Sequence, residues 1–214
     1  MQRYLVTGTD TDVGKTRLTA ALAKALVDAG RAPTIVKLVQ TGLPPGTPGD
    51  AANAGRLAGA RHLELARFGK PADPWSAALA EGTPAVRAED LRAVIDGIEG
   101  PLVAEGAGGL AVPLNRLQNF GTVAQLAKLR VVLAVGLRLG CMNHALLTIA
   151  LAEGLGLEFA GAVLVDRFEV SEPAYIDDVR RALQGKIEIL GILPFERDEA
   201  ASVTAGARLF TRLI

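Results

Sequence analysis

A run near the amino terminus carries the residue types that bind phosphate: Gly8-Thr9-Asp10-Thr11-Asp12-Val13-Gly14-Lys15-Thr16. A turn that contains glycine lets backbone N–H groups converge on phosphate oxygens, and the start of a following helix adds partial positive charge. Lys15 can reach the β- and γ-phosphates of a nucleotide, and the Thr16 hydroxyl can ligate Mg²⁺. The two glycines stand one residue further apart than in the usual G-x-x-x-x-G-K-[ST] pattern, so a strand–helix turn with a capping threonine is the alternative. The context favours phosphate binding.

Carboxylates in and after this loop need an explanation. Asp10 and Asp12 should repel phosphates, so they either point away as caps or orient a metal-bound water or a cationic substrate. Glu105 ends an apolar run, where it is either a strand-terminal acid or a ligand of Mg²⁺, direct or through water. The glycines after it indicate close approach of the backbone to a ligand and favour the metal. Asp50 begins a predicted helix, for which an N-cap is a sufficient role.

Three further polar side chains have an ordinary and a functional interpretation. Lys37 ends a predicted strand on the ligand side of the sheet, where a lysine commonly reaches solvent. Asn143 opens a predicted helix and could cap it, while the same helix N-terminus could hold a substrate carboxylate. Cys141 lacks an obvious base partner, so we expect it and His144 to be packing or helix-start residues rather than a nucleophile and its base.

The elements that must position these side chains alternate along the chain. Strands are predicted at Arg3–Gly8, Pro33–Val39, Pro101–Glu105, Val131–Gly136, Ala160–Val165 and Ile187–Leu193. Helices are predicted at Gly14–Ala29, Asp50–Ala60, Glu89–Ile98, Thr122–Leu129, Asn143–Leu155 and Pro173–Leu183. This order predicts an α/β fold with a doubly wound, mostly parallel sheet, whose ligands bind at the carboxyl ends of the strands. Gln40–Gly49 is a predicted loop, and no element is predicted within Arg61–Pro84.

Composition excludes several classes of protein. The 214 residues suffice for one sizeable domain, which we expect over residues 1–214. Lys plus Arg and Asp plus Glu total 23 each, so the chain lacks the basic charge of a general nucleic-acid binder. A single cysteine excludes an internal disulfide and a multi-cysteine zinc site. No apolar run approaches the ~18 residues of a membrane span, and acidic and glycine residues come too early for a secretory signal, so we expect a cytoplasmic protein.

The phosphate loop, from Val6 to Thr16, closely resembles the stretched loop of the dethiobiotin synthetases. Three other segments match in the same order: Lys37-Leu38-Val39-Gln40-Thr41-Gly42, Glu105-Gly106-Ala107-Gly108-Gly109 and Gly140-Cys141-Met142-Asn143-His144-Ala145-Leu146-Leu147-Thr148. The resemblance implies a P-loop NTPase-like fold and the conversion of 7,8-diaminononanoate, CO₂ and ATP to dethiobiotin, ADP and phosphate. It also implies a carbamate, a carbamic-phosphoric anhydride, Mg²⁺, and a homodimer with the substrate at its interface.

The resemblance further implies a role for each matching residue. Lys37, Lys15 and Thr11 are the implied catalytic residues, and Lys37 would neutralise the carbamate and the charge on the γ-phosphoryl oxygens. The other implied contacts are as follows: nucleotide, Asp12, Val13, Gly14, Lys15, Thr16, Leu193 and Pro194; substrate, Thr41, Gly108, Gly140, Cys141 and Asn143; Mg²⁺, Thr16, Asp50 and Glu105.

Two departures from the family pattern stand out. Val165 occupies the place of an asparagine that reads adenine, which predicts relaxed selectivity for the nucleotide base. The segment from Pro71 to Ser76 replaces a common Ser-Pro-His. There Asp73 could face an amine of the substrate, and Trp75 could pack on its alkyl chain or be buried in the core.

Other functions share this fold and loop. A partition-type ATPase switch usually carries a second lysine early in the loop and a basic or amphipathic surface, whereas this loop holds Asp10 and Asp12. A small-molecule kinase would need a hydroxyl acceptor and a lid with arginines, and the arginines within Arg56–Arg67 keep that alternative open. An amidotransferase-type synthetase needs a glutaminase portion, for which the chain has no room.

Overall fold

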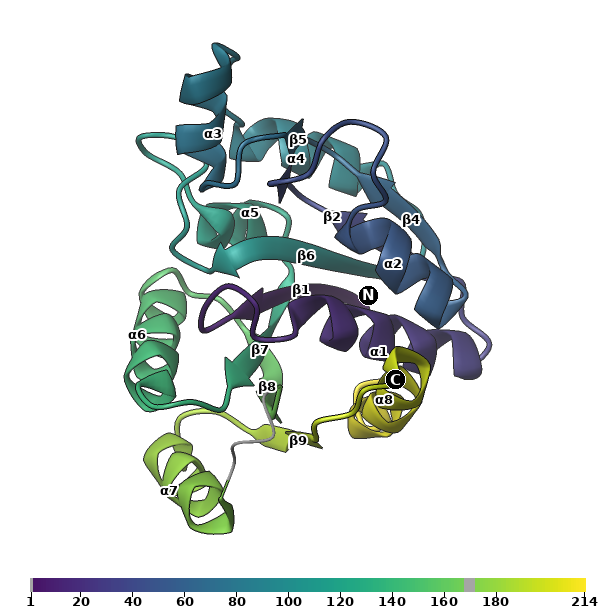
Figure 1. Ribbon diagram of the computed structural model, residues 1–214, viewed down its shortest axis with the longest axis vertical. Helices are drawn as coiled ribbons and strands as arrows, with labels where there is room; N and C mark the ends of the chain where they lie inside the picture. Colours follow the sequence, from purple (N-terminus) through teal and green to yellow (C-terminus); the bar gives the residue numbers. More distant parts are fainter. Residues whose placement is uncertain (1, 168–171) are drawn as a thin grey trace.

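The computed structural model describes residues 2–167 and 172–214, and its centre is a seven-stranded sheet (Figure 1). The strands are β4 (Arg61–Glu64), β2 (Thr34–Lys37), β6 (Leu102–Gly109), β1 (Arg3–Gly8), β7 (Arg130–Gly136), β8 (Phe159–Val165) and β9 (Ile189–Leu193), in that spatial order. Each neighbouring pair is parallel. The predicted doubly wound α/β fold is confirmed, and all the strands in this sheet end at the same edge.

Helices cover both faces of the sheet (Figure 1). One face packs on α1 (Lys15–Asp28), α2 (Asp50–Ala58) and α8 (Glu199–Ala207), which a short 3₁₀ turn (Arg208–Phe210) follows. The other face packs on α4 (Ala88–Asp96), α5 (Phe120–Leu126), α6 (Cys141–Gly154) and α7 (Pro173–Leu183). In β1, Tyr4 and Val6 point to the first face and Leu5 to the second, as the period of a strand requires. Because both faces are covered, the central strands are mostly apolar, with Thr7 and Glu105 as buried polar residues.

Several element boundaries differ from the prediction. The helix predicted to open at Asn143 begins at Cys141, after Gly140 in the left-handed conformation (φ 93°). Asn143 is therefore not the cap that was considered. Asp50 is the first residue of α2, and Gly49 is the N-cap, so the Asp50 cap is also wrong. The strand predicted to end at Glu105 continues through the glycines to Gly109.

The stretch without predicted elements contains β4, a two-residue strand β5 (Arg67–Phe68) and helix α3 (Pro74–Glu81). β5 pairs in parallel with β3 (Gln40–Thr41), which lies in the predicted loop. These elements are short, and β4 is an exposed edge strand, so none shows the apolar run of a central strand. Together they lie beside the carboxyl end of β2.

One apolar side chain fixes the phosphate loop to the sheet. Val13 is 3% exposed. A Cβ at Gly8 or at Gly136 would come within 2.6 Å of a methyl carbon of Val13, which is too close for a side chain at either position. Glycine at both positions therefore lets Val13 seat beneath the loop. Gly14, the N-cap of α1, has φ 93°, a conformation that favours glycine. The loop is held from below by packing, which leaves its backbone free to face a ligand.

In the described ranges, no helix combines the length and the apolar character needed to cross a lipid bilayer.

Candidate active site

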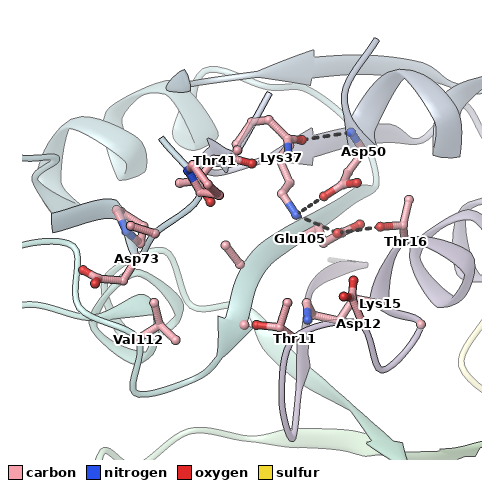
Figure 2. Close-up of a pocket in the computed structure, with 18 of the residues that line it drawn as sticks. Thr11, Asp12, Lys15, Thr16, Lys37, Thr41, Asp50, Asp73, Glu105 and Val112 are labelled. Atoms are coloured by element: carbon pink, nitrogen blue, oxygen red, sulfur yellow. Dashed lines mark hydrogen bonds and ion pairs between the residues drawn. The ribbon is translucent and has the colours of Figure 1, made fainter. Parts of the chain in front are cut away.

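A cavity of about 520 Å³ lies at the carboxyl ends of β1, β2 and β6. Figure 2 shows its labelled side chains converging from the phosphate loop, the end of β2, the start of α2 and the end of β6. Ten predicted site residues line it: Thr11, Asp12, Gly14, Lys15, Thr16, Lys37, Thr41, Asp50, Glu105 and Gly108. The edge of the sheet that the sequence pattern indicated is therefore the edge with the cavity.

The two aspartates of the phosphate loop point in different directions. The Asp10 carboxylate accepts a hydrogen bond from Thr11 N at 2.7 Å and pairs with Arg138, which follows β7. Asp12, in the left-handed region at φ 57°, lines the cavity. Lys15 Nζ donates to the Asp10 carbonyl oxygen at 2.8 Å, so the lysine lies back across its own loop. Asp10 thus joins the phosphate loop to the connection that follows β7, and Asp12 alone of the two lines the cavity.

Lys37 is the most constrained charge in the cavity. It is 2% exposed, and its Nζ lies 2.6 Å from Asp50 Oδ2, 2.8 Å from Glu105 Oε1 and 3.0 Å from the Gly106 carbonyl oxygen. Burial lowers the pKa of Lys37, but Glu105 and Asp50 outweigh it and hold the pKa above its usual value. Lys37 is therefore a fixed ammonium group and not a strand-end lysine that reaches solvent.

Oxygen atoms suited to bind Mg²⁺ lie close to the Lys37 ammonium group. Thr16 Oγ1 donates to Glu105 Oε1 at 3.0 Å, and Glu105 Oε2 is buried without a hydrogen-bond partner among the described residues. An unpartnered carboxylate oxygen is costly in a buried site unless a cation or water meets it. No cluster of three or more His, Cys, Asp or Glu side chains fit for a metal occurs in residues 2–167 and 172–214. A metal here would rely on a hydroxyl besides the two carboxylates, and the predicted set of Thr16, Asp50 and Glu105 has that composition.

Six predicted site residues do not line this cavity: Val13, Gly140, Cys141, Asn143, Leu193 and Pro194. Cys141 is 1% exposed, and its sulfur lies 3.3 Å from the hydroxyl of Tyr175. Asn143 is exposed in the first turn of α6.

The structure also shows where the residues that depart from the family pattern lie. Val165 is 3% exposed and packs against Gly14 beneath the phosphate loop. Asp73 lines the cavity, and its carboxylate caps α3 by accepting from Ser76 N at 2.9 Å. Trp75 is half-buried and does not line the cavity.

Among the side chains that line the cavity without a predicted role are Gln40, Val112 and Arg167. Gln40 is 5% exposed, and its Oε1 accepts from Asp50 N at 2.9 Å. A glutamine inside the Lys37–Gly42 match was visible, but only the fold shows that it is buried. Arg167 lies two residues beyond the end of β8, a position that the strand-end rule could have flagged.

The chain is similar to proteins of known name. A family model described as an AAA domain matches residues 2–202. An ATP-dependent dethiobiotin synthetase of Rhodococcus jostii is 41% identical, over 99% of this chain and 94% of the relative. A second, from Salmonella typhi, is 34% identical, over 90% of this chain and 92% of the relative. Both alignments span nearly the whole of both chains.

Solved structures share the fold at low sequence identity. The cell-division ATPase MinD of Pyrococcus furiosus superimposes with a TM-score of 0.62 at 17% identity, over all of both chains. A plasmid partition protein of Borrelia burgdorferi, bound to AMPPNP, gives a TM-score of 0.64 at 9% identity. It likewise covers 100% of both chains. At such identities the likeness concerns the fold alone, and it places the chain among P-loop NTPase folds.

The buried Lys15 makes stability depend on pH. Burial, followed by the repulsion of Lys37, lowers the pKa of Lys15 from 10.5 to about 8, against the attraction of Glu105. Between pH 8 and pH 10.5 the unfolded chain holds a proton on this lysine that the folded chain has lost, so the free energy of unfolding rises with pH over this range. The lysine therefore destabilises the fold most below pH 8. We expect Lys15→Met to raise the unfolding free energy at pH 7 by on the order of 1 kcal/mol, and to give no gain near pH 10.5.

Urea unfolding at pH 7 and at pH 10.5 measures this difference. Lys186→Met, at an exposed position, is the control and should give no pH-dependent gain. An equal effect of Lys15→Met at both pH values, or a loss at pH 7, contradicts the prediction.

Proposed function

The chain belongs to the family of ATP-dependent dethiobiotin synthetases, and on this premise we propose that it closes the ureido ring of dethiobiotin from 7,8-diaminononanoate, CO₂ and ATP. Members of this family are ATP-dependent cyclo-ligases. The observation that carries the proposal for this chain is the buried Lys37 ammonium, 2% exposed at the floor of the cavity that the phosphate loop lines. A fixed cation in that place suits two anions that must meet, a carbamate and a γ-phosphate.

The nucleotide would lie with its terminal phosphates over the start of α1. Gly14 and the residues before it supply backbone N–H groups, and the helix N-terminus supplies partial positive charge. Lys15 would leave the Asp10 carbonyl and turn to the phosphate oxygens, with Thr11 and Asp12 at the rim. In the proposal, no residue needs to become covalently attached to the substrate, so binding and orientation supply the catalysis.

Mg²⁺ would be held by Thr16, Asp50 and Glu105, since the free Glu105 Oε2 offers a hard oxygen ligand in the cavity wall. Bound there, the ion would neutralise charge on the phosphate oxygens. Lys37 pairs with both carboxylates at 2.6 Å and 2.8 Å, and it would share them with the ion or shift toward the carbamate.

The proposed reaction has two bond-forming steps after an amine has added to CO₂ with loss of a proton. A carbamate oxygen attacks the γ-phosphorus, and the bond to ADP breaks. The second amine then attacks the carbamoyl carbon, phosphate leaves, and the nitrogen loses its proton as the ring closes. Lys37 would hold the carbamate against the γ-phosphate, and the Thr41 hydroxyl, at the cavity wall, would bond the carbamate.

We also propose that two copies complete the substrate site. Gly140, Cys141 and Asn143 belong to the start of α6 and do not line the cavity of their own chain. Leu139 and Leu147, in and beside this segment, are 93% and 62% exposed, which suits a surface that a second copy covers. The N-terminus of the fourteen-residue helix α6 lies at this surface, and in the proposal it would bind the carboxylate of the substrate held by the partner subunit.

The decisive experiment supplies ATP, Mg²⁺, bicarbonate and 7,8-diaminononanoate and follows phosphate release with ring formation. We expect release to require both co-substrates. Lys37→Gln should lower kcat by roughly 10²–10³-fold with little change in ATP affinity, because it removes a charge that acts at the reacting atoms. Circular dichroism must show that the variant is folded.

Other outcomes would favour the alternatives. Phosphate release indifferent to the diamine would indicate a partition-type switch, and a stable phosphorylated product would indicate a small-molecule kinase. Unchanged kcat in a folded Lys37→Gln variant would remove the proposed role of Lys37.

Base selectivity should be relaxed because Val165, buried against Gly14, offers no hydrogen-bonding side chain to a base. A site that hydrogen-bonds a substrate edge rejects analogues strongly, whereas one without such bonds does not. We expect kcat/KM for ATP, CTP and GTP to differ by less than roughly tenfold. A strong preference for ATP would mean that backbone groups read the base.

The two-copy site makes a separate prediction. Sedimentation should give the mass of two chains, and Leu147→Glu should shift the protein toward one chain and raise KM for the diamine by about tenfold. The exposed Leu79→Glu, on α3, is the control. A one-chain mass for the active wild-type enzyme would contradict this part of the proposal.

A further inference from the structure

The side chain of Gln40 joins two parts of the cavity wall. Its Oε1 accepts a hydrogen bond from Asp50 N at 2.9 Å, and its Nε2 donates to the Thr41 carbonyl oxygen at 3.2 Å. One partner is a donor and the other an acceptor, so the amide has a single satisfactory orientation. Because Gln40 is only 5% exposed, water cannot readily replace these bonds.

Gln40 satisfies the first free N–H of helix α2, whose N-cap residue makes no side-chain hydrogen bond. The cap residue is Gly49, which has no side chain to accept the first free N–H groups of the helix. A Cβ at Gly49 would lie 2.5 Å from Glu64 Oε2, 2.8 Å from Gln40 Oε1 and 3.0 Å from Arg67 Nη2. A serine or aspartate at this position would displace the ends of these three side chains, and in this structure the acceptor comes from β3.

Arg67 and Glu64 stabilise the loop that leads into the start of α2. Arg67 binds Glu64 through two hydrogen bonds of 2.5 Å and 2.8 Å and donates to the Pro44 carbonyl oxygen at 2.9 Å. This fork closes the loop that leads into Gly49. Gln40 then connects β3 to the first residue of α2.

We propose that Gln40 is a positioning residue that holds Asp50 so that its carboxylate meets Lys37. Asp50 Oδ2 lies 2.6 Å from Lys37 Nζ, yet the Asp50 side chain is 33% exposed and could otherwise turn to solvent. With its N–H anchored by Gln40, the carboxylate stays directed at the ammonium and at the proposed Mg²⁺ site. The kinetic effect rests on the proposed reaction, whereas the effect on metal binding rests only on the proposed Mg²⁺ site.

The chain contains a matched control for this contact. Gln118 Oε1 accepts from Ala88 N at 2.9 Å, and Ala88 is the first residue of α4, whose N-cap Arg87 makes no side-chain cap. The device is the same, a distant glutamine that accepts the first N–H of a helix, but neither Gln118 nor Ala88 lines the cavity. Loss of Gln118 should therefore cost stability alone.

The test compares Gln40→Met, Gln40→Glu and Gln118→Met in the full chain. Gln40→Met removes the acceptor and should lower kcat about tenfold, with KM for ATP changed less than about twofold. It should also weaken Mn²⁺ binding in the presence of ADP about fivefold, measured by electron paramagnetic resonance. Gln40→Glu keeps an acceptor and should recover most of both losses, while Gln118→Met should leave both at the wild-type level.

A double-mutant cycle with Asp50→Asn separates positioning from general damage. If Gln40 acts through Asp50, Gln40→Met should cost little more once Asp50 has become Asn. Additive losses, an unchanged Gln40→Met variant, or an equal loss in Gln118→Met would each overturn the inference. If the chain proved to catalyse another reaction, the Mn²⁺ measurement would still decide whether Gln40 positions Asp50.

Discussion

The buried ammonium of Lys37 is the constraint on which the cavity depends. A cation that is 2% exposed must be neutralised and hydrogen-bonded, and the protein meets this demand with Asp50, Glu105 and the Gly106 carbonyl oxygen. Each partner restricts its neighbours in turn, since Glu105 also accepts from Thr16 and Asp50 is anchored by Gln40. The phosphate loop, β2, β6 and α2 are thereby joined at one point.

Parallel strand register brings these groups together. Lys37 on β2 pairs in register with Glu105 on β6, and Val6 on β1 pairs with Glu105 from the other side. Residues 68 positions apart in the chain become direct neighbours at the carboxyl edge. A slip of one residue would turn the Lys37 side chain to the opposite face, so the apolar packing that sets the register also sets the chemistry.

Local sequence patterns predicted both the fold class and the position of the phosphate site. The alternation of apolar runs indicated the doubly wound sheet, and the loop from Gly8 to Thr16 indicated the phosphate site, because both are signals contained in short stretches of chain. The cap alternatives for Asp50 and Asn143 were wrong, because Gly49 and Gly140 are the N-caps of α2 and α6. The metal role of Asp50 and the substrate role of Asn143 stay predictions. The short elements of Arg61–Pro84 lacked a readable pattern because β4 and β5 are four and two residues long and β4 is mostly exposed.

The amino-acid sequence by itself determined the order of the central strands and of most helices between them, the loop that can bind phosphate and the family to which the chain belongs. Only the tertiary structure decided that Asp10 turns toward Arg138 while Asp12 faces the cavity, that Val165 lies under Gly14, and that Gln40 is buried against Asp50. The reason is physical: periodicity and turn chemistry act over a few neighbouring residues, whereas burial and ion pairing depend on which distant side chains share a low-dielectric space.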